Sequence, residues 1–175
     1  NPKNIFSRNA NKFPLALYQM HDLGSWIKNS LFNHYPLHTP SAYTPFFIIG
    51  AQRSGSTLLR SILVANQKVA IPPETFVLYK TFRKFLTYQH LDWKDLSRLI
   101  ISEFESHKNF SRWNTNIFPC YQEAFQLPVK ERSLAKLIEI IYSRYIEENN
   151  PSAEIWGDKT PSNTLYINWI YRLYP

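Results

Sequence analysis

The sequence predicts an α/β fold in which a parallel sheet is flanked by helices. First, the apolar run Phe46-Phe47-Ile48-Ile49 leads into a glycine-containing loop and then into a stretch with helical spacing, which is the order strand, loop, helix. Second, two further short apolar runs, at 69–71 and 153–156, alternate with helical segments. Such alternation favours parallel strands joined by right-handed crossovers, with a binding site at the carboxyl ends of the strands.

Residues 1–45 are predicted to form a helix and a linker that precede the α/β domain of residues 46–175. Apolar residues recur at three- and four-residue steps from Leu17 to Leu31, which predicts an amphipathic helix over 14–32 that docks on the core. Trp26 and Lys28 leave a membrane-surface or partner-binding helix as the alternative. Prolines then mark the linker; they are Pro36, Pro40 and Pro45.

The segments on either side of the second strand have distinct patterns. A helix is expected over 56–66, with one apolar face made by Leu58, Leu59, Ile62 and Leu63. The strand over 69–71 is then closed by Pro72-Pro73.

The segment 76–150 is predicted to be a largely helical insertion. Two apolar faces are expected to be buried: Leu96, Leu99, Ile100 and Phe104 on one helix, and Leu134, Leu137, Ile138, Ile141 and Tyr145 on another. Residues 107–130 show little periodicity and predict an irregular packed loop, with an acceptor-binding lid as the alternative.

The last segment should be a strand and a helix. Ala153-Glu154-Ile155-Trp156 predicts the third strand, and Thr160 followed by Pro161 predicts the capped start of a helix. The residues expected on the buried face of that helix are Leu165, Trp169, Ile170 and Leu173.

Composition narrows the class of protein. With 175 residues, of which 44% are hydrophobic, the chain can build a core, and a disordered chain is excluded. The net charge of +7 suits an anionic ligand, while the lack of any run of five basic residues disfavours nucleic acid. A single cysteine, Cys120, cannot close an internal disulfide and favours a cytoplasmic location. No apolar stretch reaches the ~18 residues of a transmembrane span, and the oligomeric state is left open.

The loop Gly50-Ala51-Gln52-Arg53-Ser54-Gly55-Ser56-Thr57 is the most informative motif. It matches the phosphate-binding pattern G-x-x-x-x-G-K-[ST] at both glycines and at the final threonine, so the sheet is predicted to be P-loop-like. Ser56 occupies the lysine position, however, and the nearest cation is Arg53. Because that lysine neutralises the β and γ phosphates, its absence disfavours ATP or GTP chemistry. The remaining backbone N–H groups, hydroxyls and guanidinium suit a 5'-phosphate.

With this loop, the chain resembles the sulfotransferases that use 3'-phosphoadenosine 5'-phosphosulfate (PAPS), particularly the branch of tyrosylprotein and many bacterial sulfotransferases. The resemblance rests on three stretches: the loop with its flanks, residues 47–60; Ile71-Pro72-Pro73-Glu74-Thr75; and Trp156-Gly157-Asp158-Lys159-Thr160-Pro161-Ser162-Asn163. It implies transfer of a sulfuryl group from PAPS to a hydroxyl acceptor, which could be tyrosine, carbohydrate, lipid or a small alcohol.

The resemblance also implies roles for individual residues. The donor would be bound by Gln52, Arg53, Ser54, Gly55, Ser56, Thr57 and Leu58. Arg53 would neutralise the 5'-phosphosulfate, Glu74 would act as general base, and Lys159 would stabilise the departing phosphate. Arg60 either supports this site or is an ordinary exposed arginine. No metal is expected, because a sulfuryl group carries less charge than a phosphoryl group and the five histidines form no compact ligand pattern.

Members of this family continue into another strand and an arginine- and serine-containing segment that binds the donor's 3'-phosphate. This sequence stops at Pro175, so we expect the C-terminal part of the fold to be missing, with weak donor binding, little activity and an unpaired sheet edge. Two alternatives stay open. One is a divergent P-loop kinase or NTPase, with Ile155-Trp156-Gly157-Asp158 as a Walker B candidate. The other is a non-catalytic nucleotide-binding or interaction domain.

Overall fold

A computed structural model describes residue 24 and residues 35–41 and 44–175, so the helix predicted over 14–32 falls almost wholly outside the described residues. The strands are β1 (Phe46–Ile48), β2 (Val69–Ala70) and β3 (Ile155–Lys159). The α-helices are α3 (Ser56–Val64), α4 (Leu78–Thr87), α5 (Trp93–Glu105), α6 (Phe118–Gln126), α7 (Leu134–Asn149) and α8 (Ile167–Leu173). In the described ranges, three short 3-10 helices complete the order: η2 (Phe110–Trp113), η3 (Val129–Glu131) and η4 (Pro161–Tyr166).

The three strands form a parallel sheet in the order β1-β3-β2, which confirms the predicted α/β class. Phe46 pairs with Gly157 and Ile48 with Lys159, so the loop after β1 and the end of β3 emerge at the same edge of the sheet. Gly157 lets the ring of Phe46 lie against β3, because a Cβ there would lie 2.5 Å from that ring and the ring would have to shift. The pairing therefore brings the first and third sequence motifs together.

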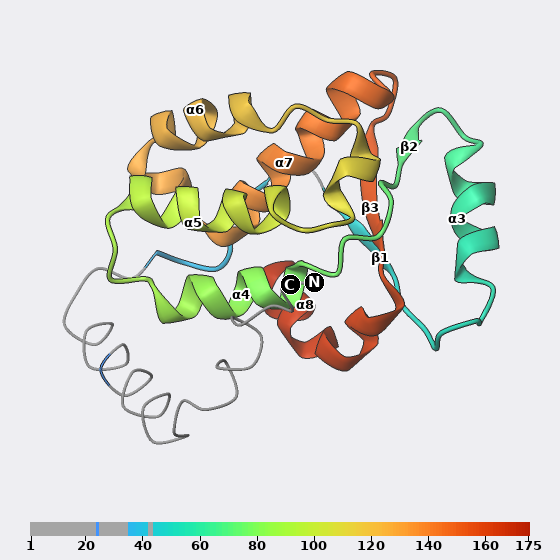
Figure 1. Ribbon diagram of the computed structural model, residues 1–175, viewed down its shortest axis with the longest axis horizontal. Helices are drawn as coiled ribbons and strands as arrows, with labels where there is room; N and C mark the ends of the chain where they lie inside the picture. The colour runs from blue at the N-terminus through green and yellow to red at the C-terminus, as the bar shows by residue number, and fades with distance from the viewer. Residues whose placement is uncertain (1–23, 25–34, 42–43) are drawn as a thin grey trace, which may run out of the picture.

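Helices lie on both sides of the sheet. In Figure 1, α4 to α7 lie to one side and α3 to the other, with β2 leading from α3 back toward the helical segment. The core joins the sheet to α7: the ring of Trp156 stacks on Tyr142 at 4.2 Å, and Tyr142 in turn meets Trp113 at 5.0 Å. The helical faces predicted over Leu96–Phe104 and Leu134–Tyr145 are buried except for Leu99 and Tyr145, which are half-buried.

Three local expectations were wrong. Residues 107–130 are not irregular, because they contain η2 and the regular helix α6. The third strand does not end at Trp156 but continues to Lys159, since its polar residues are buried and hydrogen-bonded. The segment after Thr160 begins as the 3-10 helix η4, and Leu165, which was expected on the buried face, is 77% exposed.

Three of the four apolar residues predicted on helix α3, Leu58, Leu59 and Ile62, are exposed, and Leu63 is half-buried. Leu58 is 67% exposed and Ile62 is 61% exposed, and α3 has no buried residue. Within the described residues, no helix is both long enough and apolar enough to cross a membrane.

Candidate functional site

The loop between β1 and α3 has the backbone shape of an anion-binding nest. Arg53 and Gly55 both lie in the left-handed region, with φ of 64° and 81°, and Ser54 N–H donates to the carbonyl of Ala51 at 3.3 Å. Left-handed residues turn successive N–H groups toward one side of the chain, which creates a concavity for an anion. Glycine adopts this conformation at little cost, which explains Gly55.

The N-terminus of α3 opens directly onto this loop. Its N-cap residue Gly55 contributes no capping side chain, and its first turn contains no acidic residue. The first N–H groups of a helix have no partner within the helix, and the helix dipole adds a partial positive charge there. The start of α3 is therefore available for a phosphate or sulfate group.

A hydrogen bond joins Gly50, the first glycine of the loop, to η4. Gly50 N–H donates to Thr164 Oγ1 at 2.8 Å, and that hydroxyl lies 2.9 Å from the carbonyl of Pro161, to which it can donate. This contact joins the loop to the segment that follows Lys159. Thr164 was not anticipated, although it lies only one residue beyond the third sequence motif.

Lys159 joins Glu74 to the loop that follows β1. It is the last residue of β3, and its side chain is only 4% exposed. Its Nζ donates to Thr57 Oγ1 at 3.1 Å and forms an ion pair with Glu74, whose side chain is 24% exposed. One ammonium group thus contacts both a residue that follows the nest-shaped loop and the predicted base.

The segment that carries Glu74 is held by two side chains. The guanidinium of Arg60 donates from Nε to the carbonyl of Ile71 at 2.9 Å, and Trp113 Nε1–H donates to the carbonyl of Pro73 at 2.7 Å. Arg60 is therefore half-buried and hydrogen-bonded, and it is not an ordinary exposed arginine. It supports the site indirectly, because it joins α3 to the segment before Glu74.

Asp158 is buried and hydrogen-bonded to side chains of the protein itself. It is 2% exposed, and its two carboxylate oxygens accept hydrogen bonds from Tyr142 and Asn163, each at 2.8 Å. Burial raises the pKa of Asp158, whereas the hydrogen bonds from Tyr142, Thr160 and Asn163 act in the opposite direction. With both oxygens occupied, Asp158 is poorly placed to hold Mg²⁺. This geometry weighs against the Walker B interpretation of its segment.

These elements enclose a hollow of about 420 Å³. It is lined by Gln52, Arg53, Gly55, Ser56, Thr57, Glu74, Phe76, Pro161 and Ser162. Six of these residues were predicted as site residues. Of the other predicted residues, Ser54 and Leu58 belong to the same loop and first helical turn without lining the hollow, and Lys159 lies beside it through Thr57 and Glu74. Phe76, Pro161 and Ser162 were not anticipated as lining residues.

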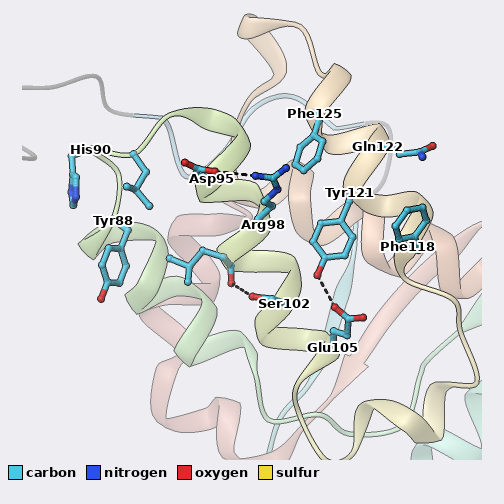
Figure 2. A pocket seen from close by; sticks show the side chains of 12 residues that line it. Tyr88, His90, Asp95, Arg98, Ser102, Glu105, Phe118, Tyr121, Gln122 and Phe125 are labelled. Atoms are coloured by element: carbon cyan, nitrogen blue, oxygen red, sulfur yellow. Dashed lines mark hydrogen bonds and ion pairs between the residues drawn. The ribbon is translucent and has the colours of Figure 1, made fainter.

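A larger groove of about 1080 Å³ lies between α5 and α6 (Figure 2). Its polar side chains pair with one another: Tyr121 donates to Glu105 at 2.7 Å, and Arg98 contacts Asp95 at 3.2 Å. The groove shares no lining residue with the hollow at the loop, and α5 and α6 lie well away from that loop in Figure 1. None of residues 107–130 lines the hollow beside Glu74.

Comparison with known proteins identifies the family. A model of the sulfotransferase family matches residues 45–175, which is well over half of the chain. No significant match was found among curated proteins or among solved structures. The matched region contains the whole loop, Glu74 and Lys159. The chain belongs to the sulfotransferase family.

Proposed function

We propose that the chain transfers a sulfuryl group from PAPS to a hydroxyl-bearing acceptor. The observation that supports this most strongly is the position of Lys159, whose ammonium contacts both Thr57 and Glu74. An anion-binding loop, a cation and a carboxylate that can take a proton therefore meet at one hollow. Sulfuryl transfer requires these three groups, because the donor is an anion, the leaving group gains charge and the acceptor loses a proton.

The loop suits the 5'-phosphosulfate of the donor. Arg53 carries the cation, the backbone from Gly55 to Thr57 offers N–H groups, and Ser56 and Thr57 add hydroxyl donors. A charge-assisted hydrogen bond contributes about 1.5 to 3 kcal/mol, so Arg53 strengthens binding without accounting for all of it. PAPS supplies the sulfuryl group and a bisphosphate leaving group. The branch of the family and the cellular location stay predictions.

Glu74 and Lys159 have complementary roles in this proposal. The carboxylate of Glu74 takes the proton of the acceptor hydroxyl while the acceptor oxygen forms a bond to sulfur. The bond between sulfur and the 5'-phosphate oxygen breaks, and its electron pair stays on that oxygen. Lys159 donates a hydrogen bond to the same oxygen. Because Nζ already lies 3.1 Å from Thr57 Oγ1, it needs only a small shift to reach an anion in the loop.

The ion pair with Lys159 also explains why Glu74 can be held in a hollow before substrates bind. In the structure, the ammonium neutralises the carboxylate. When an anionic donor occupies the loop, Lys159 has a second anion within reach, and Glu74 becomes available to the acceptor hydroxyl. Donor binding would then precede proton transfer.

The test compares Glu74→Gln with the wild-type chain. Transfer is measured as incorporation of radiolabelled sulfate from PAPS into a panel of phenols, sugars and alcohols, and binding is measured with adenosine 3',5'-bisphosphate. We expect Glu74→Gln to abolish transfer and to leave bisphosphate binding nearly unchanged, because Gln cannot take the proton.

Glu154→Gln is the matched control. Glu154 also pairs with a lysine, Lys68, but both side chains are exposed and neither lines the hollow. This variant should keep full transfer. Full turnover by Glu74→Gln would remove Glu74 as the base, and bisphosphate binding without transfer to any acceptor by the wild-type chain would favour a non-catalytic nucleotide-binding domain.

A further inference from the structure

Phe76 has a backbone conformation that aromatic residues rarely adopt. Its φ is 61°, in the left-handed region that favours glycine and asparagine. The described part of the chain contains three non-glycine residues with positive φ, and two of them, Arg53 and Phe76, line the hollow at the loop. Strained backbone concentrates at functional sites, where the fold holds a side chain in a required place.

The conformation places the ring of Phe76 in the hollow instead of the core. Its neighbours Thr75 and Val77 are 1% and 0% exposed, whereas Phe76 is 41% exposed. Exposure of this large apolar ring does not stabilise the fold, because burying the ring would be favourable. The exposed ring is two residues from Glu74 and lines the same hollow.

Aromatic contacts at the start of α4 hold the segment that contains Phe76. At the start of α4, the ring of Tyr79 stacks on Tyr166 at 4.0 Å with an interplanar angle of 12°, and it also meets the edge of Trp169 at 5.7 Å. Tyr166 belongs to η4, which also provides Pro161. The stack therefore fixes the segment of Phe76 relative to that of Pro161.

The lining of the hollow combines two chemically different sets of residues. The residues from Gln52 to Thr57 are polar and cationic and suit the anionic donor. The apolar residues are the exposed Phe76, two residues after Glu74, and the largely buried Pro161, and Ser162 adds a hydroxyl next to Pro161. A sugar would leave most of its hydroxyl groups unpaired against such an apolar surface, whereas a flat apolar ring would not.

On the basis of the function proposed above, we propose that Phe76 contacts the acceptor and selects acceptors whose hydroxyl is carried by a flat apolar ring. The ring of the acceptor stacks against Phe76, and its hydroxyl points toward Glu74. This arrangement makes Phe76 a determinant of acceptor specificity, distinct from the residues that bind the donor.

The experiment uses the full chain saturated with adenosine 3',5'-bisphosphate and two acceptor probes, 2-naphthol and N-acetylglucosamine. Binding of each probe is measured by equilibrium dialysis, and transfer is measured separately with PAPS. The wild-type chain should bind 2-naphthol in preference to the sugar. Phe76→Ala should weaken 2-naphthol binding and raise its KM on the order of tenfold, because the stacking surface is lost. The affinity for the bisphosphate should change less than about twofold.

Three further variants separate specificity from folding. Phe76→Tyr keeps the ring and should keep 2-naphthol binding. Phe76→Leu keeps most of the side-chain volume and should lose part of that binding, so it carries the test if Phe76→Ala does not fold. Phe118→Ala removes a 64% exposed phenylalanine that lines the groove on α5 and α6, and it should have no effect on either probe.

The inference is overturned if Phe76→Ala and Phe76→Leu bind 2-naphthol like the wild type, or if the wild-type chain prefers the sugar. Such a result would leave the proposed function intact as long as sulfate is still transferred and Glu74→Gln still abolishes the transfer. If no bisphosphate binds to the wild-type chain, the proposed function itself fails. Because dialysis measures acceptor binding without turnover, the two failures are distinguishable.

Discussion

Replacing Trp113 with phenylalanine should disturb the site through the segment that carries Glu74. Trp113 is 1% exposed, and its indole N–H is the donor to the carbonyl of Pro73 at 2.7 Å. The variant leaves that carbonyl without its partner, at a cost of about 1 to 3 kcal/mol. The smaller ring leaves a small cavity, which costs about 1 kcal/mol more. For a chain of this size, a total of about 2 to 4 kcal/mol lowers Tm by roughly 4 to 16 °C.

Trp93→Phe is a matched control for this prediction. Trp93 is 3% exposed, and its indole N–H donates to the carbonyl of Ala124 at the same distance of 2.7 Å, between α5 and α6. Both variants should lose a similar amount of stability, measured by circular dichroism during heating. Only Trp113→Phe should also lower the rate of sulfate transfer by the folded protein, because Trp113 binds the segment of Glu74 and Trp93 does not. Equal transfer rates for the two variants, or a Tm change under about 2 °C for Trp113→Phe, would refute this reasoning.

Three other predictions concern single side chains. Arg53→Ala should weaken binding of adenosine 3',5'-bisphosphate about 10- to 150-fold in calorimetric titration. Arg112→Ala is the control, because Arg112 is exposed and lies outside the hollow, and it should not weaken binding. Equal binding by both variants would reject Arg53 as the phosphate ligand. Lys159→Met should lower kcat at least about tenfold with a smaller effect on bisphosphate affinity, and a loss confined to affinity would assign Lys159 to binding. Burial raises the pKa of Cys120 to about 12, so Ellman's reagent at about pH 8 should label it only after unfolding; rapid labelling of the native chain would contradict that burial.

Much of the site could be predicted from local patterns. The glycines of the loop, the apolar run before it and the helical spacing after it all act over a few residues, so the order β1, loop, α3 was readable from the sequence. Glu74 and Lys159 were identified by resemblance, and the structure brings them into contact. Whether they perform the proposed chemistry stays a prediction.

Long-range features were not predictable from such patterns. The position of β3 between β1 and β2 depends on pairings across about 85 to 110 residues, which no local spacing encodes. Helix α6 was missed because the residues it buries are the small Cys120 and Ala124, while its large Phe118 stays exposed. An apolar pattern also does not reveal what covers a helix face, as the exposed residues of α3 demonstrate.

The extension of β3 was missed for a different reason. Gly157, Asp158 and Lys159 do not have the apolar character of a buried strand, and they are buried only because specific partners satisfy them. Tyr142 and Asn163 bind Asp158, while Glu74 and Thr57 bind Lys159. A strand that ends in satisfied polar residues at the carboxyl edge of a parallel sheet is typical of a binding site.

A crystal structure of the chain with adenosine 3',5'-bisphosphate would test the central claim most directly. We expect the 5'-phosphate to lie within hydrogen-bonding distance of the backbone N–H groups of residues 55–57, with the Arg53 guanidinium and Lys159 Nζ directed toward it. A bisphosphate bound in the groove between α5 and α6, or elsewhere with the loop empty, would contradict the account.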